Sequence, residues 1–496
     1  MLKFRTVAKG GGYSARVSGV LLWLLPCVGV LLIAGCSGAE TLQEEEAGSP
    51  PDRPNIIFVL TDDLDFASAQ KMPQIRSQLI EEGTSFENAF VSYPLCCPSR
   101  ATILTGLYAH NHNVKGNHLP YGGFQTFRDE GHEENKIAAS LQGVGYQTGY
   151  FGKYLNDYPG DDPTYVPPGW DEWHATAVEK TNYNEYELNE NGEVVSYAKK
   201  AKNYLPDVLS DKALEYVRGT VDSPEPFFLY ISPPSPHLPA SPAKRYRNAF
   251  AEEAPPRPPS FDEEDVSDKP LYIKSRPRLS DEEIFGIDNL HRRRLESMLA
   301  VDEMVASLIQ ELEDVGELDN TFVFLTSDNG WEQGEHRIPR EKGYPYEESA
   351  RVPFFVRGPG IAAGLKTDKL TLNTDFAPTL AEIAGVSFPA DGRSLMSLFH
   401  SEEPSSSWRS AVLLEGWGEN VRIGLPPEYK AVRTESHKYV EYATGERELY
   451  DLETDPYELE NVYESVDPTL IEDLKTRLDA LRSCTEAGCR EAENTP

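Results

Sequence analysis

The chain has 496 residues and a formal net charge of −34 at pH 7, from 81 acidic and 47 basic residues. A surface of this charge repels polyanions at long range, although salt screens the repulsion beyond about 8–10 Å. The composition therefore excludes nucleic acid as an expected partner, and an anionic substrate would need local positive charge inside a pocket.

The first segment, residues 1–35, predicts an export signal, because basic residues precede an apolar run from Val17 to Ile33. The run ends in Ile33-Ala34-Gly35-Cys36, which resembles a bacterial lipobox, whose cysteine is acylated and begins the mature protein. A transmembrane helix is the competing interpretation, but Pro26 and the small residues before Cys36 favour lipidation. We therefore expect an exported protein, anchored by lipid to a bacterial membrane outside the cytoplasm.

Residues 36–54 are rich in Ser, Gly, Pro and Glu and predict a flexible tether. The residues that follow are enough for a large core and a second, smaller lobe. We place a catalytic domain at 55–400 and a C-terminal subdomain at 401–496.

Apolar runs typical of buried strands alternate with helical patterns in the larger domain. The strand runs are Asn55–Leu60, Phe227–Ile231, Thr321–Thr326 and Phe354–Val356. The helical patterns are Gln74–Glu82, Asn135–Leu141, Asp207–Val217 and Ile287–Leu312. This alternation predicts an α/β domain with a large, mostly parallel mixed sheet flanked by helices.

The C-terminal part has a different pattern, of short strands separated by turn residues. These strands are predicted at Ala411–Glu415, Lys430–Arg433, Lys438–Tyr442 and Glu448–Asp451, before a helix at about Asp467–Arg482. They indicate a smaller antiparallel sheet and helix. Cys484 and Cys489 are expected to form a disulfide in an oxidising exterior; a metal clip is the alternative, although no second cysteine pair lies nearby.

Polar residues follow three of the predicted strands, at Asp62-Asp63, Ser235-Pro236-His237 and Ser327-Asp328-Asn329-Gly330. Sites in open α/β sheets form at the carboxyl ends of strands. Taken singly, each acid could be a turn residue or a helix cap. Together, Asp62, Asp63, Asp328 and Asn329 offer only oxygen ligands, which selects Ca²⁺ or Mg²⁺ over zinc.

Two adjacent cysteines, Cys96 and Cys97, precede Pro98-Ser99-Arg100. A free cysteine usually behaves as a small buried hydrophobe, but this run resembles the sulfatase signature Cys-x-Pro-Ser-Arg. The resemblance extends over nearly the whole mature chain, through Asp62-Asp63, Gly145–Leu155, Asp328–Gly330, Lys342, Val356–Gly360 and Gly445–Leu452. It is strongest for the branch of N-acetylglucosamine-6-sulfatases and extracellular heparan sulfatases, on the evidence of Cys96-Cys97, His110-Asn111-His112 and Lys153-Tyr154-Leu155-Asn156.

The resemblance implies an alkaline-phosphatase-like fold and a nucleophile made from Cys96. In sulfatases a formylglycine-generating enzyme oxidises this cysteine to an aldehyde, whose hydrate attacks sulfur. One Ca²⁺, or less typically Mg²⁺, would be held by Asp62, Asp63, Asp328 and Asn329 and would touch residue 96. The implied substrate is a sulfated carbohydrate, of the 6-O-sulfated N-acetylglucosamine type met in glycosaminoglycan degradation, or a small sulfate ester.

The remaining site residues are also implied by position in the family motifs. Arg100 would support the hydrate and the metal ligands, and Asp328 would help to activate the attacking hydroxyl. Lys153 and Lys342 would bind sulfate, His237 would contact the ester, and His237 or Lys342 would protonate the leaving alcohol. His336 is a further candidate for the substrate pocket. Leu155 departs from many relatives, which have a histidine there.

Three other functions remain open from the sequence. The chain could be an arylsulfatase, or a phosphonate or phosphodiester hydrolase on the same scaffold. From a different class, it could be an inactive lipoprotein that binds at a surface. The absence of a long basic insertion argues against a large polysulfated polymer as substrate.

Overall fold

The computed structural model describes residues 53–177, 183–221, 223–399, 408–418 and 426–494. The predicted export signal, lipidation at Cys36 and most of the predicted tether lie outside these residues. Residues 51–496 form one compact unit that includes both predicted sheets. No helix in the described part of the chain is both long and apolar enough to cross a membrane.

The larger sheet has ten strands in the order β11-β2-β10-β9-β1-β8-β4-β5-β6-β7. Their bounds are β1 Asn55–Thr61, β2 Thr84–Phe86, β4 Gln147–Gly152, β5 Glu172–Thr176, β6 Tyr186–Glu190, β7 Glu193–Tyr197, β8 Phe227–Ser232, β9 Thr321–Ser327, β10 Phe354–Arg357 and β11 Leu365–Thr367. The central strands β9, β1, β8, β4 and β5 are parallel, whereas β10, β6 and β7 run antiparallel to their neighbours. The prediction of a large, mostly parallel mixed sheet is confirmed.

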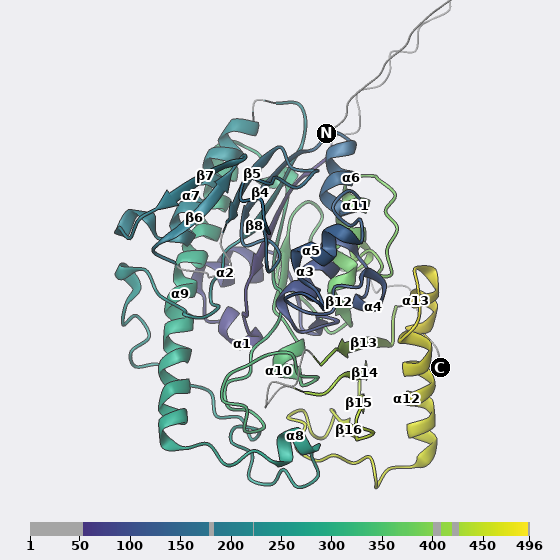
Figure 1. Ribbon diagram of the computed structural model, residues 1–496. Coiled ribbons are helices and arrows are strands. Elements are labelled where there is room, and N and C mark those ends of the chain that lie inside the picture. The colour runs from purple at the N-terminus through teal and green to yellow at the C-terminus, as the bar shows by residue number, and fades with distance from the viewer. Residues whose placement is uncertain (1–52, 178–182, 222, 400–407, 419–425, 495–496) are drawn as a thin grey trace, which may run out of the picture. The chain divides into compact units, whose positions relative to one another are not determined.

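Helices cover both faces of this sheet (Figure 1). One face carries α3 Cys96–Thr105, α5 Gly123–Asp129, α6 Ile137–Gly143 and α11 Phe376–Ile383, and the other carries α2 Pro73–Ile75, α7 Leu205–Thr220 and α9 Asp281–Asp314. Strand β1 shows why both faces are covered: Phe58 packs into the first core, and Ile57 and Val59 pack into the second. A strand buried on both faces must be apolar throughout, which accounts for its continuous hydrophobic run.

The smaller sheet is antiparallel, with the order β13-β14-β15-β16. Its strands are β13 Ala411–Gly416, β14 Tyr429–Thr434, β15 His437–Tyr442 and β16 Arg447–Asp451, and α12 Pro468–Leu481 and α13 Ala487–Ala492 lie beside it (Figure 1). Leu474, Leu478 and Leu481 of α12 pack into a core with the strands. The predicted small sheet and closing helix are confirmed.

The remaining elements are short. They are α1 Phe66–Ala69, α4 Ala109–His112, α8 Leu271–Lys274, α10 Glu347–Ala350, the strand pair β3 Ala89–Phe90 and β12 Thr371–Leu372, a π-helical turn at Arg76–Ile80, and 3₁₀ turns at Ala201–Asn203, Lys244–Tyr246, Leu318–Asn320, Asn373–Asp375 and Met396–Leu398.

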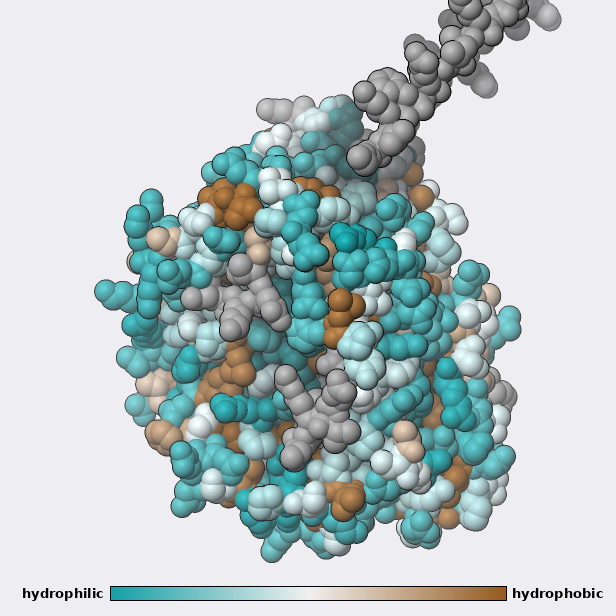
Figure 2. Space-filling view, viewed as in Figure 1, coloured by the Kyte–Doolittle hydropathy of each residue, from teal (hydrophilic) through white to brown (hydrophobic). Residues whose placement is uncertain are grey.

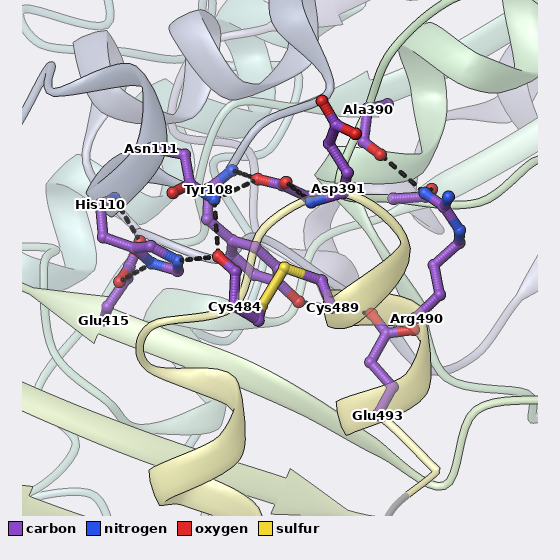
Figure 3. The surroundings of a disulfide bond; sticks show 12 residues. Tyr108, His110, Asn111, Ala390, Asp391, Glu415, Cys484, Cys489, Arg490 and Glu493 are labelled. Atoms are coloured by element: carbon purple, nitrogen blue, oxygen red, sulfur yellow. Dashed lines mark hydrogen bonds and ion pairs between the residues drawn. A yellow bond between two sulfur atoms is a disulfide. The ribbon is translucent and has the colours of Figure 1, made fainter.

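A buried junction joins the small sheet and the chain end to the larger domain (Figure 3). Cys484 and Cys489 are disulfide-bonded there. The carbonyl oxygen of Cys484 accepts hydrogen bonds from His110 Nε2 at 3.0 Å and Asn111 Nδ2 at 2.9 Å. Figure 3 shows both side chains directed from α4 toward the disulfide loop.

Three local predictions differ from the structure. The helix expected at Gln74–Glu82 is divided into α2 and the π-helical turn. Helix α9 begins before the predicted Ile287, because Ser280 and Glu283 form a capping box at its start. Asp302, which falls within the apolar stripe of α9, accepts hydrogen bonds from the backbone of Gln74 and Ile75. Strands β4 to β7 were not predicted as strands.

Candidate active site

The carboxyl ends of four adjacent parallel strands bring the predicted site residues together. Asp62 and Asp63 follow β1, His237 follows β8, Lys153 follows β4, and Asp328 with Asn329 follows β9. The loops are tied to each other, since Asp62 N donates to Ser235 O at 3.1 Å and Asp328 N donates to Thr61 O at 3.1 Å. The predicted site residues therefore lie together at the edge of the sheet where sites of open α/β folds form.

Cys96 is the first residue of α3, preceded by Leu95 in an extended conformation. Its side chain is buried, and Lys342 Nζ lies 2.9 Å from Cys96 Sγ. Asp62 Oδ1 lies 3.6 Å from the same sulfur. The unsatisfied N–H groups at the start of a helix favour negative charge at this position. The helix backbone and Lys342 therefore both stabilise negative charge at residue 96.

Two buried cations, Arg100 and Lys342, and the partly buried Lys153 each contact a buried carboxylate near Cys96. Lys153 Nζ contacts Asp62 Oδ2 at 2.6 Å, Arg100 Nε contacts Asp328 Oδ2 at 2.7 Å, and Lys342 Nζ contacts Asp63 Oδ1. His237 Nε2 lies 3.8 Å from Asp63 Oδ2, and 31% of its side chain remains exposed. The site therefore gathers three cationic side chains, balanced by three carboxylates, with His237 on its open side.

Burial and neighbouring charges shift the pKa values of these groups in different directions. Burial alone would raise the pKa of Asp62, but Lys153, His237 and Arg100 hold it well below its ordinary value. Asp328 keeps a raised pKa, because burial and the adjacent Asp62 outweigh Arg100. Burial also raises the pKa of the Cys96 thiol, against the opposing effect of Lys153 and Lys342.

The carboxylates and the amide could hold a cation, because two of their oxygens lack partners. Asp63 Oδ2 and Asn329 Oδ1 are buried with no hydrogen-bond partner among the described residues. Ligand atoms of Asp62, Asp63, Cys96 and His237 lie within 4.8 Å of one another. Buried oxygen atoms without partners are costly unless a ligand satisfies them, so this donor set fits a hard divalent cation.

The backbone around these ligands is tightly constrained. Asp63 has a φ of 67°, which is uncommon for a residue other than glycine and typical of functional sites. A Cβ at Gly330 would lie 2.1 Å from Glu348 O, so only glycine allows this approach behind Asn329.

Two positioning residues were missed by the sequence analysis. Ser232 Oγ accepts a hydrogen bond from Arg100 Nη1 at 2.7 Å, and Lys153 O accepts from the same nitrogen at 2.7 Å. Arg294 of α9 donates to Asp63 O at 2.6 Å. Ser232 could have been suspected from its place at the end of β8, but nothing in a helical pattern distinguishes Arg294.

Cys97 and His336 lie apart from the charged group around Cys96. Cys97 packs into the apolar core between the sheet and α3, as a structural cysteine would. His336, a candidate for the substrate pocket, is fully buried, and its Nδ1 lies 2.7 Å from Glu263 Oε2. Burial, with a further effect of Lys269, lowers the pKa of His336 to about 3.

A hollow lies beside Lys342 and Leu95 and includes Tyr93, Trp417 and Tyr429. It offers aromatic surface next to the residues that flank Cys96. A larger hollow, of about 360 Å³, lies between β4, β5 and α7 and includes none of the predicted site residues. The face of the molecule in Figure 2 is mainly hydrophilic, with hydrophobic side chains in separate small groups.

Comparison with known proteins agrees with this geometry. Residues 54–386 match the sulfatase family, and residues 334–484 match the domain described as N-sulphoglucosamine sulphohydrolase, C-terminal. The N-acetylglucosamine-6-sulfatase of Homo sapiens is 34% identical, over 94% of this chain and 90% of its own length.

Two further relatives extend the comparison. An extracellular sulfatase homologue of Caenorhabditis elegans is 38% identical over 76% of this chain, which spans 54% of that protein. A solved structure of a complex with its substrate D-glucosamine-2-N,6-O-disulfate has a TM-score of 0.76 and 25% identity, over 89% of this chain and 99% of that one. The chain therefore belongs to the sulfatase family and is a sulfuric ester hydrolase.

Proposed function

We propose that this sulfatase removes a 6-O-sulfate from an N-acetylglucosamine-type sugar, with formylglycine made from Cys96 as the source of the nucleophile. The observation that carries the proposal is the position of Cys96 at the start of α3, between Lys342 Nζ at 2.9 Å and Asp62 Oδ1 at 3.6 Å. A buried cysteine with a purely structural role would not need these charged neighbours.

The hydrated aldehyde supplies two hydroxyls on one carbon: one displaces the alcohol from sulfur, and the other loses its proton so that the aldehyde re-forms and sulfate leaves. Lys153 and Lys342 bind the sulfate oxygens, in exchange for part of their contact with Asp62 and Asp63. His237, on the open side, donates a proton to the leaving alcohol oxygen. Arg100 keeps Asp328 in place beside the attacking hydroxyl.

Ca²⁺ is the cation we propose for Asp62, Asp63, Asp328 and Asn329, since all four offer oxygen. When bound, it would offset the charge of the sulfate ester and favour the deprotonated hydroxyl. The two unpartnered oxygens, Asp63 Oδ2 and Asn329 Oδ1, support this assignment.

The sugar assignment rests on relatives. The human N-acetylglucosamine-6-sulfatase covers nearly the whole chain, and the structural neighbour with the disulfated glucosamine aligns over 89% of it. The aromatic side chains beside Lys342 would offer a sugar ring a surface to stack on. We also propose that the protein is exported and lipidated at Cys36, which a C36A variant would test by its release from the membrane fraction.

The test has two parts. Mass spectrometry of the peptide that contains residue 96 should show the loss of sulfur and two hydrogens and the gain of one oxygen. Parallel kinetics on N-acetylglucosamine 6-sulfate, an aryl sulfate and an aryl phosphodiester should then give the highest kcat/KM for the sugar. An unmodified Cys96 in fully active protein would overturn the nucleophile, and a preference for either aryl substrate would overturn the sugar.

A further inference from the structure

A second group of buried acids surrounds His336, apart from the carboxylates near Cys96. The partly buried Glu348 and the buried Glu458 lie beside His336, Glu263 is hydrogen-bonded to its Nδ1, and Glu332 lies near Glu348. Glu332 Oε2 and Glu348 Oε2 have no hydrogen-bond partner among the described residues. Negative charge buried in this way is costly unless a cation or a donor balances it.

Two lysines lie in this group. Lys269 Nζ lies 3.6 Å from Glu263 Oε1 and donates to Leu459 O at 2.8 Å. Lys438 Nζ lies 2.7 Å from Glu458 Oε1 and 2.9 Å from Glu347 Oε1. Because it is shared by two carboxylates, it neutralises the charge of one of them. Neither lysine forms an ion pair with Glu332 or Glu348 among the described residues.

The geometry of His336 identifies what is missing. Its Nδ1 hydrogen-bonds Glu263 Oε2 at 2.7 Å, whereas Nε2 is buried and has no hydrogen-bond partner among the described residues. One ring nitrogen of His336 and one oxygen each of Glu348 and Glu458 lie within 4.8 Å of one another. A carboxylate on one nitrogen and a lone pair left on the other is the arrangement found at metal-binding histidines.

We propose that His336, Glu348 and Glu458 bind a structural Zn²⁺. One imidazole and two carboxylates suit zinc, which is bound by nitrogen and oxygen at about 2.0–2.2 Å. An imidazole is a poor ligand for Ca²⁺ or Mg²⁺, so this ion differs from the one expected beside Cys96. Bond lengths of this size require the three side chains to draw together from their present separation.

The ion would join three segments that are distant in sequence. His336 lies in the loop after β9, Glu348 lies in α10, and Glu458 lies beyond β16 in the C-terminal part. Lys342 lies midway between His336 and Glu348, so both ends of the loop that carries it would be fixed. Trp331 N also donates to Glu348 O at 2.8 Å, which connects the ion to the Asp328–Asn329 loop.

The test is elemental analysis of the full-length protein after equilibration with Zn²⁺ and removal of free metal. We expect about one equivalent of zinc per chain in the wild type and a loss of at least about tenfold in H336Q and in E458Q. E448Q is the matched control: Glu448 is equally buried but is hydrogen-bonded by Tyr346 and Tyr450, so it should keep the zinc.

Two measurements on the wild type keep the proposal falsifiable if the variants fail to fold. X-ray absorption at the zinc edge should show nitrogen and oxygen ligands with one imidazole, and a zinc chelator should lower Tm, which added Zn²⁺ restores. Folded wild-type protein that binds no zinc would overturn the proposal. So would zinc that remains in folded H336Q, because the ion would then lie elsewhere.

Discussion

The junction and the surroundings of Cys96 both bury carboxylates, and they differ in whether each carboxylate oxygen has a hydrogen-bond partner. In the junction of the small sheet and the larger domain, Asp375 accepts from Arg409 Nη1 at 2.7 Å and Nη2 at 2.6 Å. Glu415 is likewise bound by His110 Nδ1 and Lys430 Nζ, both at 2.9 Å. Around Cys96, by contrast, Asp63 Oδ2 and Asn329 Oδ1 are buried without a hydrogen-bond partner among the described residues. Full pairing of the carboxylate oxygens suits a region that holds the fold, and oxygens left without partners suit a region that binds a ligand.

The largest expected effect is on the nucleophile. C96A should lower kcat/KM for the sulfated sugar by at least about 10⁴-fold, because the reaction loses the residue that forms the bond to sulfur. C97A is the matched control and should keep kcat within about tenfold, since Cys97 packs in the core. Turnover in C96A close to that of the wild type would contradict the assignment.

Loss of a buried ion pair in the junction should lower stability and leave catalysis unchanged. R409M removes the buried partner of Asp375 and should lower the free energy of unfolding by about 3–5 kcal/mol, because an uncompensated carboxylate remains. Denaturant unfolding measures this loss. We expect kcat of the folded fraction to be unchanged, and a lowered kcat with normal stability would show that the two regions are not separable in this way.

Lys153 should affect chemistry more than stability. K153A removes a cation 2.6 Å from Asp62, and kcat/KM should fall by about 10²–10³-fold because the sulfate loses a fixed positive partner. The matched control is K366A. Lys366 forms an exposed ion pair with Glu87 at 3.6 Å, worth about 0–1 kcal/mol. Equal kinetics in the two variants would exclude the sulfate-binding role.

The smallest effect concerns pH. Burial alone would raise the pKa of Glu415, but Lys430 and His110 lower this pKa to about 2. The pairing therefore stabilises the fold above the unfolded pKa of about 4.5, and this stability is lost as pH falls toward 2. E415Q should be less stable than the wild type by about 2–3 kcal/mol at pH 7, and the difference should shrink below pH 4.5. A difference independent of pH would exclude this ionic origin.

The sequence predicted the sheet well where burial is continuous. Strand β1 is apolar on both faces, and the prediction ends within one residue of its observed end. Strand β4 was missed because Gly149, Tyr150 and Gly152 do not give an apolar run, although the sheet buries them. The helix expected at Gln74–Glu82 was divided by a π-helical turn that no periodicity indicates.

The active-site cluster was predictable for a related reason. Parallel strands place their carboxyl ends at one edge, so Asp62, Lys153, His237 and Asp328 had to lie near each other. His336 follows the same strand as Asp328, yet its ring turns to Glu263. The surroundings of His336 also include Glu458 and Lys438, and their positions depend on how the small sheet packs against the larger domain. The residue pattern of a single segment carries no information about that packing.

The burial of Cys96 limits when its proposed modification could take place relative to folding. Its side chain is 1% exposed, and its backbone belongs to the first turn of a helix packed on the sheet. Under the proposed function, an enzyme that oxidises this thiol would need access to it, so conversion would have to precede folding. The active fraction would then depend on the rate of modification relative to the rate of folding. A chain that folded first would be stable but would lack the proposed nucleophile.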